Sequence, residues 1–128
     1  MRDDTFSIVN KTKGRLPNLP FLDIKEAILG KRYRLSLVFI GKTRSQTLTK
    51  TYRKKDKASN VLSFPLGKDE GEIFITPDVA RHEAKDFSTT PHKHMGYLFI
   101  HGLLHLKGYT HGSKMEHKEQ ALRKKWSV

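Results

Sequence analysis

The stretch HGLLHLKGYTH, residues 101–111, holds three of the seven histidines in this 128-residue chain. The first two lie four residues apart, and the third follows six residues later, after Gly108. Residues four apart on a helix share one face, so His101 and His105 can reach one ion. Glycine commonly ends a helix, and a chain that turns back at Gly108 can bring His111 to the same ion. The stretch therefore predicts a helix that presents a three-histidine metal site.

Three neutral imidazoles suit one Zn²⁺ per chain and leave its fourth tetrahedral position open. A water at that position would have its pKa lowered to about 7, which is a catalytic arrangement. Structural zinc sites usually have four protein ligands, often cysteines, and this chain has no cysteine. His94 or His117 is an alternative fourth ligand that would close a structural site. Nickel and copper also suit three imidazoles.

The same spacing, H-x-x-x-H-x-x-G-x-x-H, occurs in the metzincin peptidases, but Gly102 stands here in place of their glutamate. That glutamate activates water and later protonates the leaving amine, and glycine can do neither. Cleavage of RNA is less demanding, because the 2′-hydroxyl can serve as an internal nucleophile. Gly102 therefore argues against hydrolysis of amide bonds, and we regard a peptidase as the weakest hypothesis for this chain.

The charge of the chain points to a polyanion as the binding partner. There are 25 Lys and Arg residues against 13 Asp and Glu residues, which gives a net charge of +12. Such a field attracts nucleic acid, although it supplies affinity and no sequence specificity. No apolar run approaches the length of about 20 residues needed to span a membrane. Without a signal-peptide pattern, we expect a cytoplasmic location and no membrane partner.

The pattern of apolar residues predicts an α+β fold, a small mixed sheet packed with helices that include a metzincin-like metal-binding helix. We expect one domain over residues 1–128. Phe21, Ile24, Ala27 and Ile28 share the expected buried face of the first helix, and Pro65 should close the third strand. The expected strands are residues 5–10, 33–41, 60–65 and 72–76, and the expected helices are 19–30, 43–53, 77–87, 91–108 and 113–128.

The triplet resembles the YbeY family of endoribonucleases when it is taken with two earlier stretches. These are YRKKDKASNVLSFP, residues 52–65, and GEIFITPDVA, residues 71–80. The resemblance covers about residues 5–125. It implies a zinc-dependent, single-strand-specific endoribonuclease that acts in rRNA maturation, in 3′-end processing of 16S rRNA, and in ribosome quality control.

The resemblance also implies roles for particular residues. His101, His105 and His111 would be the zinc ligands, and Arg53 and His111 would be catalytic, with Arg53 binding phosphate. The implied partners are single-stranded RNA, the small ribosomal subunit and assembly factors, without a small-molecule cofactor. Taken by itself, the basic run around Arg53 is better explained as a solvated charge run. Thr110 departs from the family pattern, which has an aspartate there.

The main alternative is a non-catalytic RNA-binding ribosome assembly factor whose metal only holds the fold together. Other polar residues are expected to be solvated, and Trp126 is expected to anchor the last helix in the core. The residues expected at the surface are Glu72, Glu83, Asp86, His82, His92 and His94.

Overall fold

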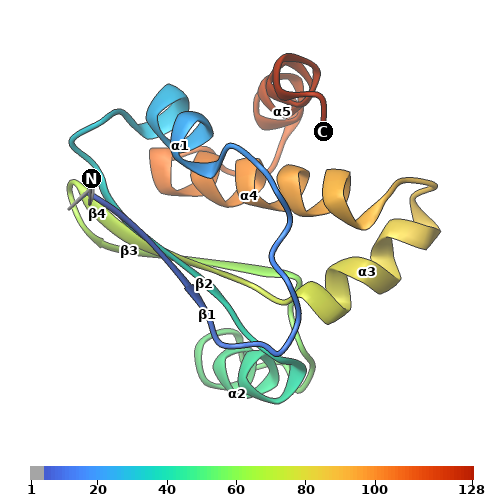
Figure 1. Ribbon diagram of the computed structural model, residues 1–128. Coiled ribbons are helices and arrows are strands. Elements are labelled where there is room, and N and C mark those ends of the chain that lie inside the picture. The colour runs from blue at the N-terminus through green and yellow to red at the C-terminus, as the bar shows by residue number, and fades with distance from the viewer. Residues whose placement is uncertain (1–4) are drawn as a thin grey trace.

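The computed structural model describes residues 5–128, which form a small sheet with helices on both sides (Figure 1). Each predicted strand and helix is present, so the predicted α+β class is confirmed. The elements follow in the order β1 (Phe6–Asn10), α1 (Phe21–Leu29), β2 (Arg34–Phe39), α2 (Lys42–Arg53), β3 (Val61–Gly67), β4 (Glu70–Ile75), α3 (Pro77–Asp86), α4 (Pro91–Lys107) and α5 (Ser113–Trp126).

The sheet is mixed, with the strand order β1-β2-β4-β3. β1 and β4 both run parallel to β2, and β3 pairs antiparallel with β4. β2 is therefore an inner strand, as its apolar residues on both faces predict: Leu37 and Phe39 are fully buried and Val38 nearly so. A short turn joins β3 to β4, and α3 follows β4 directly.

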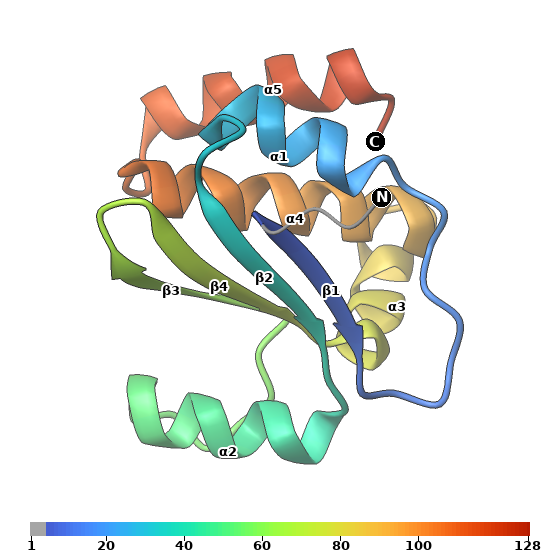
Figure 2. The same ribbon diagram turned by 60° about the vertical axis from the view of Figure 1, so that its left-hand side comes forward.

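The helices form layers around the sheet. Figures 1 and 2 show α1 and α4 over one face of the sheet, α5 outside them, and α2 alone against the other face. The main core lies between the sheet and α4, where Phe99, Leu103 and Ile73 are fully buried. Trp126 packs against this core from α5, as predicted. Among residues 5–128, no helix is long and apolar enough to cross a membrane.

α4, which carries the histidine stretch, has clear signals at both ends. The Thr90 side chain accepts a hydrogen bond from the backbone N–H of Lys93, and Pro91 occupies the first turn. The missing N–H of proline costs nothing at this position. At the other end, Gly108 adopts the left-handed conformation with φ 110°, and its N–H bonds to carbonyls of the last turn. The helix therefore ends where the sequence predicts.

Two predictions about the packing were wrong. Ala27 is exposed, and the side chain that is buried in its place on α1 is Lys25, whose Nζ lies 3.2 Å from the Lys31 carbonyl oxygen. A lysine can be buried when its ammonium group finds oxygen acceptors. β3 also continues past Pro65 to Gly67, with an irregular register at that point. An edge strand tolerates proline because its outer N–H groups have no partner strand.

Candidate metal centre

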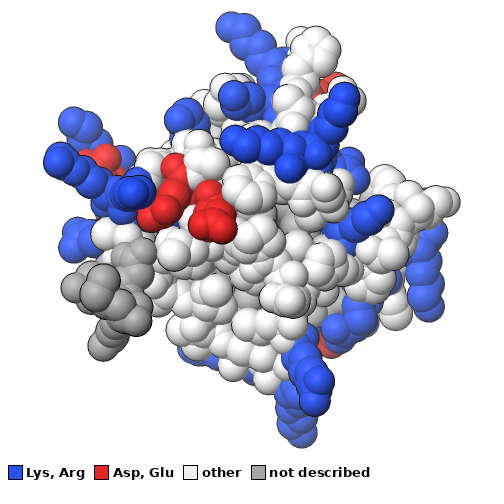
Figure 3. Space-filling view, turned by 45° about the horizontal axis from the view of Figure 1, so that its top comes forward, with Lys and Arg blue, Asp and Glu red and all other residues white. Residues whose placement is uncertain are grey.

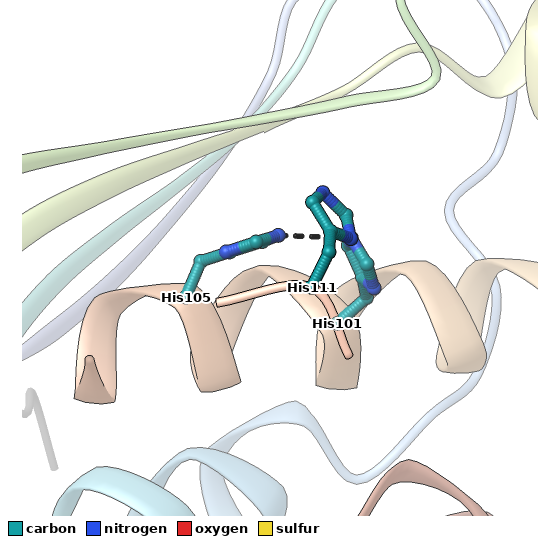
Figure 4. A group of neighbouring side chains, drawn as sticks. All are labelled: His101, His105 and His111. Carbon is teal, nitrogen blue, oxygen red and sulfur yellow. Dashed lines mark hydrogen bonds between the residues drawn. The ribbon is translucent and has the colours of Figure 1, made fainter. Parts of the chain in front are cut away.

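Three histidine side chains converge beside the C-terminal half of α4. His101 and His105 project from the helix, and His111 comes from the chain that follows it (Figure 4). One ring nitrogen from each lies within 4.8 Å of the other two, and the ring centroids are 4.6, 4.8 and 5.3 Å apart. The structure thus brings together the three residues that the spacing predicts would share one ion.

The turn after α4 depends on glycine. At Gly108, φ is 110°, a conformation that side chains with a Cβ rarely adopt. The N–H of Tyr109 then bonds to the carbonyl of Leu104, which directs the chain back along the helix toward His111. Gly112 also has a positive φ, 153°, at the start of α5. Two glycines on either side of His111 therefore allow its return to the ion site.

Hydrogen bonds fix the orientation of the two helical imidazoles. His101 Nδ1 donates to Glu119 Oε1 at 2.7 Å, and His105 Nδ1 donates to the Tyr109 carbonyl at 3.1 Å. In each neutral ring the proton is thus on Nδ1, which leaves a lone pair on Nε2. The two Nε2 atoms face each other at 3.1 Å, the contact dashed in Figure 4. Two lone pairs that face each other at this distance can bind one metal ion together.

The ring of His105 is held in the neutral form that binds metals. Burial is the main cause that lowers its pKa below the usual value, followed by the charges of His101 and His111. The hydrogen bond to the Tyr109 carbonyl opposes this shift, and Arg53 adds a smaller decrease. A neutral imidazole at pH 7 offers its lone pair to a metal without first losing a proton.

The separation of the nitrogen atoms fits a first-row transition metal. Two nitrogens bound to one tetrahedral zinc at about 2.0–2.1 Å lie about 3.4 Å apart. The 3.1 Å between the Nε2 atoms of His101 and His105 needs only a small adjustment to match this value. His94 and His117, the alternative fourth ligands, are not in the group, since His94 bonds to Glu83 and His117 is exposed.

The histidines line a hollow of about 390 Å³ that Arg53 also lines. The other lining residues are Asn60, Val61 and Ser63, so none of the lining residues is acidic. Arg53 is the last residue of α2 and is exposed, and among residues 5–128 it has no carboxylate partner. A hollow with a free guanidinium and no carboxylate is suited to an anion.

Buried hydroxyl groups hold the basic loop that follows Arg53. Ser45 Oγ of α2 donates to the Ser59 carbonyl and accepts from the Ser59 N–H, both at 2.9 Å. Thr49 Oγ1 lies 2.7 Å from Ser59 Oγ. Residues 54–58 therefore form a loop closed against its own helix. The basic side chains of this segment are exposed, as expected for a solvated charge run.

Gly102 packs tightly against the sheet. A Cβ added there would lie 3.0 Å from Ser63 Oγ and 3.2 Å from Ile73 Cδ1. Ser63 Oγ also donates to the Gly102 carbonyl at 3.0 Å, which joins β3 to α4 beside the hollow. A side chain at this position, such as the glutamate of a metzincin, would therefore crowd Ser63 and Ile73.

A second carboxylate–histidine pair lies further along α4. His94 is buried, and its Nε2 lies 2.9 Å from Glu83 Oε1 of α3. Both carboxylate oxygens of Glu83 also accept from the Asn60 side chain, at 3.0 and 3.2 Å. The predictions of a surface position for His94 and a solvated carboxylate for Glu83 were wrong. The periodicity that places His101 on this face of α4 also places His94 there, seven residues earlier.

Comparisons with known proteins decide the family. Residues 18–127 match the family described as Endoribonuclease YbeY. The chain is 32% identical over 135 aligned positions to endoribonuclease YbeY of Staphylococcus carnosus (strain TM300), covering 96% of this chain and 88% of that protein. It is 35% identical over 109 positions to endoribonuclease YbeY of Staphylococcus aureus (strain JH9), covering 74% and 70%.

The chain belongs to the endoribonuclease YbeY family.

The fold agrees with this assignment. The solution structure of a Thermotoga maritima protein superposes with a TM-score of 0.66 at 26% identity, covering 95% of this chain and 91% of that one. Family membership confirms the resemblance inferred from the three sequence stretches. The YbeY family pattern expected from the sequence has an aspartate where this chain has Thr110. Thr110 is exposed, and its side chain forms no hydrogen bond with any residue from 5 to 128.

The carboxylate nearest the three histidines in this YbeY family member is Glu119, which sequence reasoning missed. It comes from α5, and its side chain is 10% exposed beside His101, whose side chain is 17% exposed. Glu119 lies four residues after Met115 and three before Leu122, the two buried apolar residues of that helix. That spacing places it on the buried face of α5, a signal that can be read from the sequence.

Proposed function

We propose that the chain is a zinc-dependent endoribonuclease specific for single-stranded RNA. The observation that carries this proposal is the hollow that is lined by three convergent histidines and by Arg53, with no acidic lining residue. The names of the curated relatives support RNA cleavage. In this proposal His101, His105 and His111 are the ligands of one Zn²⁺ per chain, and residues 1–128 form one domain.

The chain's own residues have separate tasks in this reaction. When bound, a divalent cation would supply Lewis acidity at the scissile phosphate. Arg53 binds the non-bridging oxygens of that phosphate and stabilises the charge that develops on them. Glu119 and the Tyr109 carbonyl keep the imidazoles of His101 and His105 oriented. His111, which is exposed, completes the ligand set, so its catalytic role is to help hold the metal ion.

The surface charge suits an extended RNA partner. The chain carries a net charge of +12, and in Figure 3 lysine and arginine side chains extend around the face drawn, with only small acidic groups among them. Contacts of this kind bind phosphates without reading sequence. We propose that the substrate is rRNA, in particular the 3′ end of 16S rRNA, and that the chain serves ribosome quality control. The proposed partners are the small ribosomal subunit and assembly factors, in the cytoplasm.

The test compares cleavage of a labelled single-stranded RNA by native protein, Arg53→Ala and His111→Ala, with RNA binding measured separately. Native protein should cut the single strand and spare a duplex, and both variants should bind RNA but cut it much more slowly. Circular dichroism verifies that the variants fold. If native protein binds RNA without cutting it, and loss of metal unfolds the chain, the protein is instead a binding factor with a structural metal.

A further inference from the structure

A second hollow lies next to the metal centre, between the end of α3, the first half of α4 and α5. Its volume is about 300 Å³. We call it the α5 pocket and define it by six of its lining residues: Phe87, His94, Tyr97, Glu116, Gln120 and Arg123. Glu119, the partner of His101, also lines it, so this side chain separates the α5 pocket from the metal centre.

A row of aromatic rings runs along α4 from the α5 pocket to the metal centre. Phe87 stacks on His94 with ring centroids 5.5 Å apart and planes 20° from parallel. His94 and Tyr97 follow at 5.7 Å, and Tyr97 and His101 at 5.9 Å. Since seven residues of helix span about 10 Å, the stacked pair lies within a few nucleotides of a phosphate at the histidines. A single strand of RNA is therefore long enough to span both sites.

The outer ring of this row is largely open to solvent. Phe87 is 68% exposed, the largest value among the exposed large hydrophobic residues described. His94 behind it is 3% exposed and is held by Glu83, so the pair forms a fixed platform with one ring open to solvent. Exposed aromatic rings are the usual stacking sites for bases of single-stranded RNA.

The polar groups of the α5 pocket suit the edge of a base better than a phosphate. The side chains of Glu116 and Gln120 are exposed and form no hydrogen bond with any residue from 5 to 128. Arg123 is engaged, because its guanidinium lies 4.8 Å from the centre of the Tyr97 ring and its Nε donates to the Val128 carbonyl. The free carboxylate of Glu116 repels phosphate but accepts hydrogen bonds from amino groups of bases.

We propose that the α5 pocket binds a nucleobase that carries an amino group, namely adenine, cytosine or guanine in preference to uracil. The base stacks on Phe87, and its edge bonds to Glu116 and Gln120. It belongs to the strand whose scissile phosphate lies at the three histidines, so this substrate preference rests on the proposed function. Phosphate contacts do not read sequence, so the α5 pocket would add a base preference to the ribonuclease. That preference would apply at one fixed distance from the cut.

Binding is tested without any cleavage, by adding adenosine or uridine 5′-monophosphate to ¹⁵N-labelled protein and following its NMR spectrum. Adenosine monophosphate should shift the side-chain amide of Gln120 and the backbone amides of Phe87 and Tyr97, at lower concentration than uridine monophosphate. Phe87→Ala should weaken adenosine monophosphate binding about fivefold or more, as expected for the loss of one stacked ring. Leu66→Ala, which removes an exposed apolar side chain from the far end of β3, should leave it unchanged.

The second measurement is the base composition around cut sites in a pool of random single-stranded RNA. Native protein should enrich amino-bearing bases at one fixed offset, and Phe87→Ala should lose that enrichment while still cutting. Equal binding of adenosine monophosphate by native protein and Phe87→Ala would contradict base binding in the α5 pocket. So would a pocket that responds to arginine amide but to neither nucleotide, because that result would indicate a basic protein segment as the ligand. If native protein cuts no RNA, the proposed function fails, but the nucleotide titration still decides the pocket.

Discussion

The carboxylate of Glu119 on α5 lies 2.7 Å from Nδ1 of His101 on α4, at the boundary between the metal centre and the α5 pocket. Both side chains are largely shielded from solvent. A carboxylate that accepts from Nδ1 fixes the tautomer, so that Nε2 faces the ion, and it makes that nitrogen a better donor to a metal. The last helix therefore takes part in the metal centre although it contributes no ligand.

Replacing Glu119 should weaken metal binding without removing a ligand. We expect Glu119→Ala to lower zinc affinity by about 10- to 100-fold, the usual effect of removing such a partner. Glu119→Gln should recover part of the loss, because its amide oxygen can still accept from Nδ1. Competition with a chromophoric chelator measures the affinity. Glu116→Ala, on the same helix but away from His101, is the matched control, and an equal loss in that variant would contradict the role of Glu119.

The neutral state of His105 predicts how the metal-free protein responds to pH. In the unfolded chain its imidazole titrates near 6.5, and in the folded protein its pKa is lower, mainly through burial. Between the two values the unfolded state binds more protons, so stability falls as pH decreases below about 6.5. Urea unfolding of chelated protein at about pH 7.5 and about pH 5.5 measures this loss.

His105→Gln should reduce the loss of stability between these two pH values, because the substituted side chain does not titrate. His92→Gln, which removes an exposed histidine from the first turn of the same helix, should leave the loss unchanged. The native protein could instead become more stable over the same decrease in pH, by an amount that depends on His105. That result would contradict a lowered pKa for His105.

Gly102 predicts the cost of adding a side chain between α4 and the sheet. In Gly102→Ala the new Cβ would lie 3.0 Å from Ser63 Oγ and 3.2 Å from Ile73 Cδ1, so these neighbours must move. We expect the free energy of unfolding to fall by about 1–3 kcal/mol, as in other overpacked cores. Chemical denaturation measures this change. Gly14→Ala, where a Cβ would meet nothing within 4 Å, is the control and should be close to neutral.

Arg53 should matter through the geometry of its guanidinium as well as through its charge. Arg53→Ala should lower the rate of RNA cleavage by about a hundredfold, the effect of removing one group that stabilises transition-state charge. Arg53→Lys should recover only part of this, because an ammonium cannot bind two phosphate oxygens in a fixed fork. Single-turnover cleavage with saturating protein separates this loss from weaker RNA binding. Equal rates for native protein and Arg53→Ala would exclude Arg53 from the reaction.

Much of the fold follows from local patterns in the sequence. The inner strand β2 is apolar on both faces, and α4 begins at Pro91 and ends at Gly108, so both elements could be predicted with their positions. Local patterns do not show which element will cover a given side chain. The burial of Lys25 and the passage of β3 through Pro65 depend on neighbours distant in sequence, and these were the points where prediction was wrong.

The metal centre also has a part that local sequence predicts and a part that depends on packing. His101, His105 and His111 lie within eleven residues, so helix geometry and one glycine turn were enough to predict that they meet. Glu119 and Arg53 come from other helices, and only the packing of α5 and α2 brings Glu119 against His101 and Arg53 into the same hollow. The resemblance to a family suggested Arg53, whereas the spacing of α5 shows only that Glu119 is on its buried face, not that it meets His101.

The most direct test of the central proposal is a metal titration of the nuclease reaction. Protein stripped with a chelator is given increasing amounts of zinc, and cleavage of a labelled single-stranded RNA is followed beside the circular dichroism spectrum. We expect no cleavage by the stripped but folded protein, and a rise that reaches its plateau at one zinc ion per chain. Cleavage that persists in the stripped protein, or stays absent at full zinc occupancy, would contradict a nuclease centred on His101, His105 and His111.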